Sequence, residues 1–152
     1  MWKPDLFTDA KFAVGDQFVV TPNATWADAD CKAKSVAPKL SLQAHSAPID
    51  SKFDADFQNL YVTLHGSWDR SPSTGFKVVQ IPFTKGADGG YAPTAPADSA
   101  TGYNEIFSNV DVTKCSTTQC FRPAGLIVDP QGRMYFTSDN PIEGEVFMIG
   151  QM

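Results

Sequence analysis

The clearest pattern of apolar and polar positions in this chain spans residues 60–83. This segment reads LYVTLHGSWDRSPSTGFKVVQIPF, in which two runs of β-branched and aromatic residues flank a polar, turn-rich centre. The pattern is typical of two antiparallel strands joined by an elaborated loop. We therefore predict strands over residues 60–64 and 76–83, with the polar cluster of residues 65–70 at the corner between them.

Shorter runs predict further strands on both sides of this pair. Leu40 and Leu42 alternate with polar residues, which predicts a strand, and residues 49–53 alternate again. Residues 85–101 are rich in Gly, Ala, Pro, Asp and Ser and predict a surface loop. Further strands are predicted at residues 103–110, 124–129, 134–137 and 145–149, with a Pro- and Gly-containing turn at 129–133.

The end of the chain repeats the order of elements in its middle. Residues 47–83 and 122–150 each run through a Pro-led strand, a turn, an aromatic strand, a polar corner and a Gly-led strand. Two copies of such a meander are typical of β-propeller blades, which have four antiparallel strands. We predict an all-β fold of about two blades from a larger propeller, since two blades cannot close a ring. A two-sheet β-sandwich is the alternative.

The predicted organisation is one incomplete domain. Residues 1–39 form an N-terminal arm, with a short hairpin or an extended segment in residues 1–20 and a turn of helix near residues 26–30. The two blades cover about residues 40–110 and 121–150, and the loop containing Cys115 and Cys120 joins them. The strand at 103–110 is the outer strand of the first blade.

Composition and charge narrow the possible functions. The chain has 152 residues, of which 42% are apolar and 19% charged, as in folded soluble domains. The net charge of −5 argues against nucleic acid as a partner, because no basic stripe could neutralise phosphates. No run approaches the roughly 18–20 apolar residues that span a bilayer. The first residues show no apolar core of a signal peptide.

Two features nevertheless favour an oxidising, extracellular environment. Cys115 and Cys120 bracket a short polar loop that a disulfide could close, although two free thiols or half of a metal site are alternatives. Asn23-Ala24-Thr25 is an N-glycosylation sequon. Cys31 is left over, and its partner is expected outside the chain. We expect a secreted protein whose signal peptide is not in this chain, so that the chain is a fragment.

Four segments carry a resemblance to a known family. They read GDQFVVTPNATW, LSLQAHSAPID, LHGSWDRSPSTGFKVVQIPF and CFRPAGLIVDPQGRMYFTSDNPIEGEVFMI, and they cover most of residues 15–150. Together they resemble the C-terminal part of the glucose/sorbosone dehydrogenase family, and most closely its fungal secreted branch, the pyranose dehydrogenases. The resemblance implies a six-bladed β-propeller that holds pyrroloquinoline quinone (PQQ) and Ca²⁺. It also implies oxidation of a sugar hydroxyl or aldehyde by hydride transfer to the quinone.

Four residues suit the PQQ site that the resemblance implies. PQQ is a planar ortho-quinone with three carboxylates, so its site needs cations or hydrogen-bond donors and a flat apolar surface. Arg122 could clamp a carboxylate through two parallel hydrogen bonds. His65, at the end of the second strand, could donate to the quinone or to a carboxylate. Trp68 could cover the ring, and His45 lies just before the inner strand of the first copy.

Each of these residues also has a structural interpretation. A histidine at a strand end is often a satisfied structural residue, Trp68 could pack between blades, and Arg122 could be a surface residue beside the disulfide. Asp69 and Arg70 are most simply an ion pair that braces the corner loop. In the second copy the matching corner holds Asp139 and Asn140, which could hydrogen-bond to the loop.

The resemblance leaves two roles outside this chain. The family's base is a histidine of an early blade and its calcium is held largely by mid-chain groups, so we assign no catalytic residue and no metal ligand here. The chain alone is expected to bind PQQ poorly. The implied partners are a sugar substrate and an electron acceptor such as a cytochrome domain or an external quinone. The alternative function is a non-catalytic propeller module that binds sugar or protein.

Overall fold

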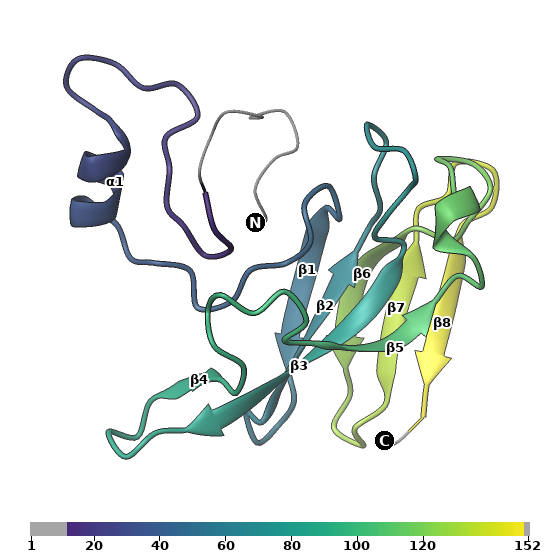
Figure 1. The fold of residues 1–152 in the computed structure, drawn as a ribbon. Coiled ribbons are helices and arrows are strands. Elements are labelled where there is room, and N and C mark those ends of the chain that lie inside the picture. The colour runs from purple at the N-terminus through teal and green to yellow at the C-terminus, as the bar shows by residue number, and fades with distance from the viewer. Residues whose placement is uncertain (1–11, 151–152) are drawn as a thin grey trace.

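The computed structural model describes residues 12–150, which form two antiparallel sheets and an N-terminal arm (Figure 1). Part of the predicted arm, residues 1–11, lies outside the described residues. Residues 12–22 contain no strand, so the short hairpin predicted there is not formed in the described part. The arm continues into the helix α1 (Asp28–Lys34), which begins later and runs further than the predicted turn at residues 26–30.

Helix α1 is short but has the charges that such a helix favours. Asp28 and Asp30 lie in its first turn, and Lys32 and Lys34 in its last turn, so that both ends complement the helix dipole. The Asp30 carboxylate accepts a hydrogen bond from the Ala27 backbone nitrogen at 3.1 Å. Asp28 accepts one from the Val19 nitrogen at 2.8 Å, so the acidic pair is used to hold the arm together.

The first sheet follows the predicted meander. Its strands are β1 (Pro48–Phe53), β2 (Asn59–Leu64), β3 (Lys77–Lys85), β4 (Tyr91–Pro93) and β5 (Asn104–Ser108). All pairs are antiparallel, and β3 pairs with β2 on one side and with both β4 and β5 on the other. The predicted outer strand is therefore confirmed as β5. The loop predicted at residues 85–101 contains the short strand β4, which extends the far end of β3.

The second sheet contains the three predicted strands of the C-terminal copy. They are β6 (Pro123–Val128), β7 (Met134–Ser138) and β8 (Glu145–Ile149), paired in that order. A tight turn at Asp129 connects β6 to β7, as predicted, because the Asp129 carboxylate accepts from the backbone nitrogens of Gln131 and Arg133. The short 3₁₀ helix η1 (Val112–Lys114) lies in the connection between the two sheets.

One predicted strand is not formed. Leu40 and Leu42 lie in an irregular segment, where they pack as partly buried side chains on Val62, Val79 and Ile81 of the first sheet. Their alternation therefore reflects burial on a sheet face rather than membership of the sheet. The segment meets the end of the sheet through the Ser46 carbonyl, which accepts from the Gly66 nitrogen at 3.1 Å.

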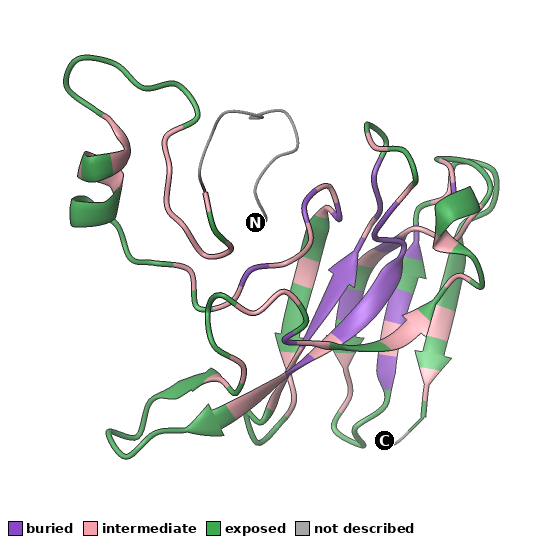
Figure 2. Cartoon of the chain, in the orientation of Figure 1, coloured by how far each residue is buried: buried purple, intermediate pink, exposed green. Residues whose placement is uncertain are grey.

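The main core lies between the two sheets. Tyr61 and Val78 of the first sheet pack against Leu126, Met134 and Phe136 of the second, and the buried positions of Figure 2 concentrate on these strands. A cluster of four phenylalanine rings adds to this core. Their closest ring centroids are 4.8–4.9 Å apart, and the four are Phe107, Phe121, Phe136 and Phe147.

Two hydrogen bonds also tie the sheets together. The Thr63 hydroxyl donates to the Ala124 carbonyl at 2.7 Å, and the Leu126 nitrogen donates to the Asp50 carboxylate at 2.9 Å. Because one bond reaches β2 and the other reaches β1, the pair fixes how β6 lies across these two strands. That placement brings the loops at one end of both sheets together.

Candidate functional site

The candidate site lies at this shared end of the two sheets. His65 directly follows β2, Arg122 directly precedes β6, and Asp139 directly follows β7. The antiparallel pairing of β6 with β7 places Arg122 beside Asp139. His65, which is 57 and 74 positions away from them in sequence, meets both because β6 packs across β1 and β2. The Asp139 nitrogen donates to the Arg122 carbonyl at 3.2 Å, which continues this pairing by one step.

His65, Arg122 and Asp139 form a connected polar cluster. Arg122 Nη2 lies 3.1 Å from His65 Nδ1, and His65 Nε2 lies 2.6 Å from Asp139 Oδ1. A guanidinium can only donate, so Nδ1 of His65 must accept and Nε2 must carry the proton that goes to Asp139. The histidine is thereby held as the neutral Nε2–H form, with a cation on one side and a carboxylate on the other.

Arg122 has one donor that the cluster does not use. Its Nη1 donates to the Thr117 carbonyl at 3.3 Å, while Nε lies 3.6 Å from Asp139 Oδ1, within ion-pair range but too far for a hydrogen bond. This Nε is buried and, among the described residues, has no hydrogen-bond partner. An unpaired donor of this kind is costly unless a ligand or water satisfies it. Arg122 is therefore not the exposed surface residue that was the alternative interpretation, since its side chain is only 17% exposed.

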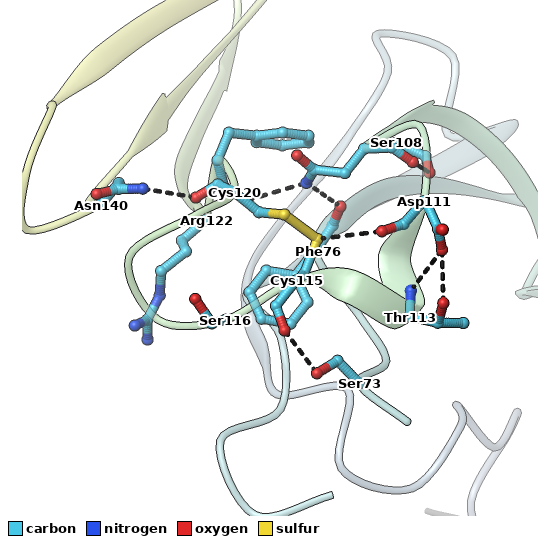
Figure 3. Close-up of a disulfide and its surroundings, with 12 residues drawn as sticks. Ser73, Phe76, Ser108, Asp111, Thr113, Cys115, Ser116, Cys120, Arg122 and Asn140 are labelled. Carbon is cyan, nitrogen blue, oxygen red and sulfur yellow. Dashed lines mark hydrogen bonds between the residues drawn. A yellow bond between two sulfur atoms is a disulfide. The ribbon is translucent and has the colours of Figure 1, made fainter. Parts of the chain in front are cut away.

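A loop closed by a disulfide lies beside Arg122 and contacts it. Cys115 and Cys120 are joined, as predicted, and Figure 3 shows Arg122 beside the loop that they close. The Ser73 hydroxyl donates to the Cys115 carbonyl at 2.7 Å, and the Asn140 amide donates to the Cys120 carbonyl at 2.8 Å. The loop that carries Thr117 is thus fixed at both of its cysteines.

His45 and Trp68 line a separate pocket at the same end of the first sheet. The pocket has a volume of about 420 Å³, and its walls include Leu42, Gly66 and Asp69. His45 Nδ1 lies 3.0 Å from Asp69 Oδ1. Trp68 is 82% exposed, so it does not pack between the two sheets that this chain forms.

The predicted ion pair between Asp69 and Arg70 is wrong. Asp69 pairs with His45 instead, and Arg70 Nη1 donates to the Ala44 carbonyl at 3.4 Å. Both residues still brace the corner, but they attach it to residues 44–45 rather than to each other. The reason is that the chain preceding β1 runs alongside the corner. The resulting contact joins His45 and Asp69, which are 24 residues apart in sequence, so a local pattern does not reveal it.

The structure therefore separates the four predicted site residues into two pairs. His65 and Arg122 contact each other, whereas His45 and Trp68 line the neighbouring pocket. The sequence predicted only a loop hydrogen bond for Asp139 and Asn140. In the structure Asn140 makes that bond, whereas Asp139 contacts both His65 and Arg122. Its signal was its position at the second copy's corner, which matches that of His65 in the first.

The part of the chain that the structure describes contains neither a cluster of metal-binding side chains nor a membrane-spanning helix. Between residues 12 and 150, no group of three or more His, Cys, Asp or Glu side chains is arranged to hold a metal ion. Within the same range, no helix has the length and apolar character needed to cross a bilayer.

Comparison with known proteins defines the class first by fold. The chain superposes on the holo form of the pyranose dehydrogenase PQQ domain from Coprinopsis cinerea with a TM-score of 0.84 and 42% identity, covering 99% of this chain and 38% of that one. It also superposes on the calcium structure of the Trichoderma reesei Carbohydrate-Active Enzymes Family AA12 protein with a TM-score of 0.83 and 39% identity, over 100% and 36% of the two chains. The predicted all-β propeller portion is thus confirmed.

The sequence comparison then gives the family. The TrAA12-like family model matches residues 1–152, so the chain belongs to this family. It is 42% identical to the pyrroloquinoline quinone-dependent pyranose dehydrogenase of Coprinopsis cinerea, over all of this chain and 22% of that protein. It is 39% identical to the pyrroloquinoline quinone-dependent sugar dehydrogenase of Hypocrea jecorina, over 99% of this chain and 32% of that protein. The chain thus spans between a fifth and a third of these relatives' lengths, and the predicted family resemblance is confirmed.

Proposed function

We propose that this chain is part of a secreted PQQ-dependent sugar dehydrogenase and supplies one side of its cofactor site. The observation that carries the proposal is the His65–Arg122–Asp139 cluster, with a buried and unpaired Arg122 Nε. The relatives named above, which are PQQ-dependent dehydrogenases, support the same reading. We further propose that residues 40–110 and 121–150 act as two blades of the propeller, after an arm at residues 1–39.

The donors present here fit a group with several carboxylates. Arg122 offers a full positive charge on a side chain that is mostly buried, where the weaker solvent screening strengthens an ion pair. Its free Nε is the donor that a ligand oxygen would satisfy. When bound, PQQ would supply the electron-accepting quinone, and this chain would hold it in place.

We propose that His65 and Asp139 act through Arg122. Both ring nitrogens of His65 are engaged, one by Arg122 and one by Asp139, so that His65 has no spare donor in this arrangement. His65 therefore orients Arg122 Nη2, and Asp139 holds the histidine in the form that can accept. Asp139 also offsets part of the Arg122 charge, which limits the cost of burying the guanidinium.

His45 and Trp68 are proposed contacts for the flat face of the cofactor. The exposed indole of Trp68 offers a planar apolar surface. Gly66 and Ser67, which follow His65 directly in the sequence, also line its pocket. His45 is tethered by Asp69, which would keep its ring at the pocket wall.

The remaining parts of the reaction are proposed to lie in other parts of the complete protein. The base that takes the sugar hydroxyl proton and the groups that hold Ca²⁺ are not assigned to this chain. The electron acceptor is proposed to be a cytochrome domain or an external quinone. An extracellular location is supported by the Cys115–Cys120 disulfide, which persists in oxidising compartments.

The experiment is a PQQ titration of the complete protein, with Ca²⁺ present, followed by visible absorbance. We expect Arg122→Ala to weaken PQQ binding by about 10- to 100-fold, since a hydrogen bond to a charged group contributes about 1.5–3 kcal/mol. The PQQ affinity of Arg122→Lys, which keeps the charge but loses the forked donors, should lie between those of the wild type and Arg122→Ala. Arg133→Ala is the matched control, because Arg133 pairs with Asp129 in the turn at the other end of β6. Unchanged affinity in Arg122→Ala would reject the assignment.

A further inference from the structure

A second chemically distinct feature lies in the N-terminal arm, away from the candidate site. Asn23-Ala24-Thr25 is the only Asn-X-Ser/Thr sequence in the chain, since the other asparagines, Asn59, Asn104, Asn109 and Asn140, are not followed by Ser or Thr two positions later. Such a sequence is the acceptor for N-linked glycans in secreted proteins.

The sequon forms a self-contained turn. The Asn23 nitrogen donates to the Trp26 carbonyl at 2.9 Å, and Asn23 Oδ1 accepts from the Thr25 nitrogen at 2.9 Å and from the Thr25 hydroxyl at 3.0 Å. A third donor, the Trp26 nitrogen, reaches the same oxygen at 2.9 Å. The side-chain oxygen is therefore fully used inside the turn. The amide nitrogen Nδ2 takes part in none of these bonds, and a glycan attached to it would break none of them.

The surroundings leave room for a large substituent. Residues 21–26 are all exposed, and they form the outer part of the arm next to α1, on the side away from the two sheets (Figures 1 and 2). The side chain of Trp26 is 38% exposed, and the nearby Val20 is 71% exposed. A glycan at this position would shield apolar surface without touching the His65–Arg122–Asp139 cluster.

We propose that Asn23 carries an N-linked glycan. The donor class is an oligosaccharide linked to a lipid pyrophosphate. The bond between Asn23 Nδ2 and the first sugar's anomeric carbon forms, the bond from that carbon to the pyrophosphate oxygen breaks, and Nδ2 gives up one proton. The inference rests on the secretion included in the proposed function, but not on PQQ binding. Its location on the arm means that the glycan serves solubility and protection of the arm rather than the reaction.

The test is peptide mass spectrometry of the complete protein secreted from a yeast host. Enzymatic release of N-glycans in H₂¹⁸O should convert Asn23 to ¹⁸O-labelled Asp in the wild type. Thr25→Ser keeps the sequon and should retain the label, whereas Thr25→Ala and Asn23→Gln should lose it. Thr25→Ala leaves Asn23 in place, so loss of the label there cannot come from the missing asparagine.

An unlabelled, unmodified Asn23 in the secreted wild type would overturn the proposal. The mass of this peptide does not depend on PQQ, so failure here is distinguishable from failure of the cofactor site. As a cross-check, PQQ affinity should be the same in the wild type and in Asn23→Gln. A change in affinity beyond twofold would contradict the claim that the glycan is remote from the site.

Discussion

Arg122 Nη2 lies 3.1 Å from Nδ1 of His65, which places a permanent cation against the unprotonated nitrogen of a neutral histidine. The Asp139 carboxylate accepts a hydrogen bond from the opposite ring nitrogen, Nε2, at 2.6 Å. Three residues from the two sheets thus depend on one another for their hydrogen-bonding states. A change at any one of them should be detectable at the other two.

The first prediction concerns the protonation form of His65. Because Arg122 can only donate, we expect ¹⁵N NMR of the histidine-labelled protein to show His65 as the neutral Nε2–H tautomer at neutral pH. Asp139→Leu removes the acceptor, so the ring should become a mixture of tautomers and PQQ binding should weaken by several fold. Asp139→Glu should restore part of both signals. A His65 spectrum unchanged in Asp139→Leu would contradict the positioning role.

The second prediction concerns stability at low pH. Burial alone would raise the pKa of Asp50, but hydrogen bonds from the Leu126 nitrogen and from Lys52 outweigh it, and the pKa is lowered below its usual value. A lowered pKa in the folded state gives stability that is present above the unfolded pKa, near 4, and is lost as the pH falls through the folded pKa. Asp50→Asn should therefore cost about 1 kcal/mol at pH 7 and less at pH 3.

Urea unfolding of the complete protein at pH 7 and pH 3 measures this difference. Asp98→Asn is the matched control, since Asp98 is an exposed acid in the loop after β4. The interpretation is wrong if Asp50→Asn destabilises equally at both pH values, because the contribution of the charge would then be absent.

The third prediction concerns the disulfide loop. A cross-link closing so short a loop stabilises the folded state by about 2 kcal/mol through the unfolded chain's lost entropy. Cys115→Ser with Cys120→Ser should lower stability by about that amount, and PQQ affinity should also fall, because the Thr117 carbonyl that holds Arg122 Nη1 becomes mobile. Gln119→Ala, which changes an exposed side chain inside the same loop, is the control and should change neither quantity. If the double variant loses stability but binds PQQ normally, the loop does not position Arg122.

The fourth prediction compares two glycines with positive φ. Gly66 has φ +109°, and a Cβ added there would lie 2.4 Å from the ring of Phe76. Gly132 has φ +76°, but a Cβ there would meet nothing within 4 Å. Both substitutions to Ala incur backbone strain of about 1 kcal/mol, but only Gly66→Ala must also displace a buried ring. We expect Gly66→Ala to lower the thermal midpoint clearly more than Gly132→Ala, and equal shifts would show that Phe76 moves aside freely.

Local pattern was sufficient for most of the strands. The β-branched and aromatic runs at 60–64 and 134–137, and the Pro-Gly turn at 129–133, appear in the structure within a residue or two, because alternation and turn chemistry act over a few neighbouring residues. The prediction failed where burial did not come from strand pairing. Leu40 and Leu42 are partly buried on the face of the first sheet. The short strand β4 pairs with residues 83–85 of β3, beyond the residues of β3 that pair with β5.

For the site, the sequence by itself determined which residue types stand at the ends of the strands. It placed His65 after one strand and Arg122 before another, and the family resemblance assigned both to one cofactor site. Only the tertiary structure decided that Asp139 completes the cluster and that Asp69 turns to His45 rather than to Arg70. The reason is physical: these contacts join residues 24 to 74 positions apart, and they exist only once the core between the sheets has set the two strand ends side by side.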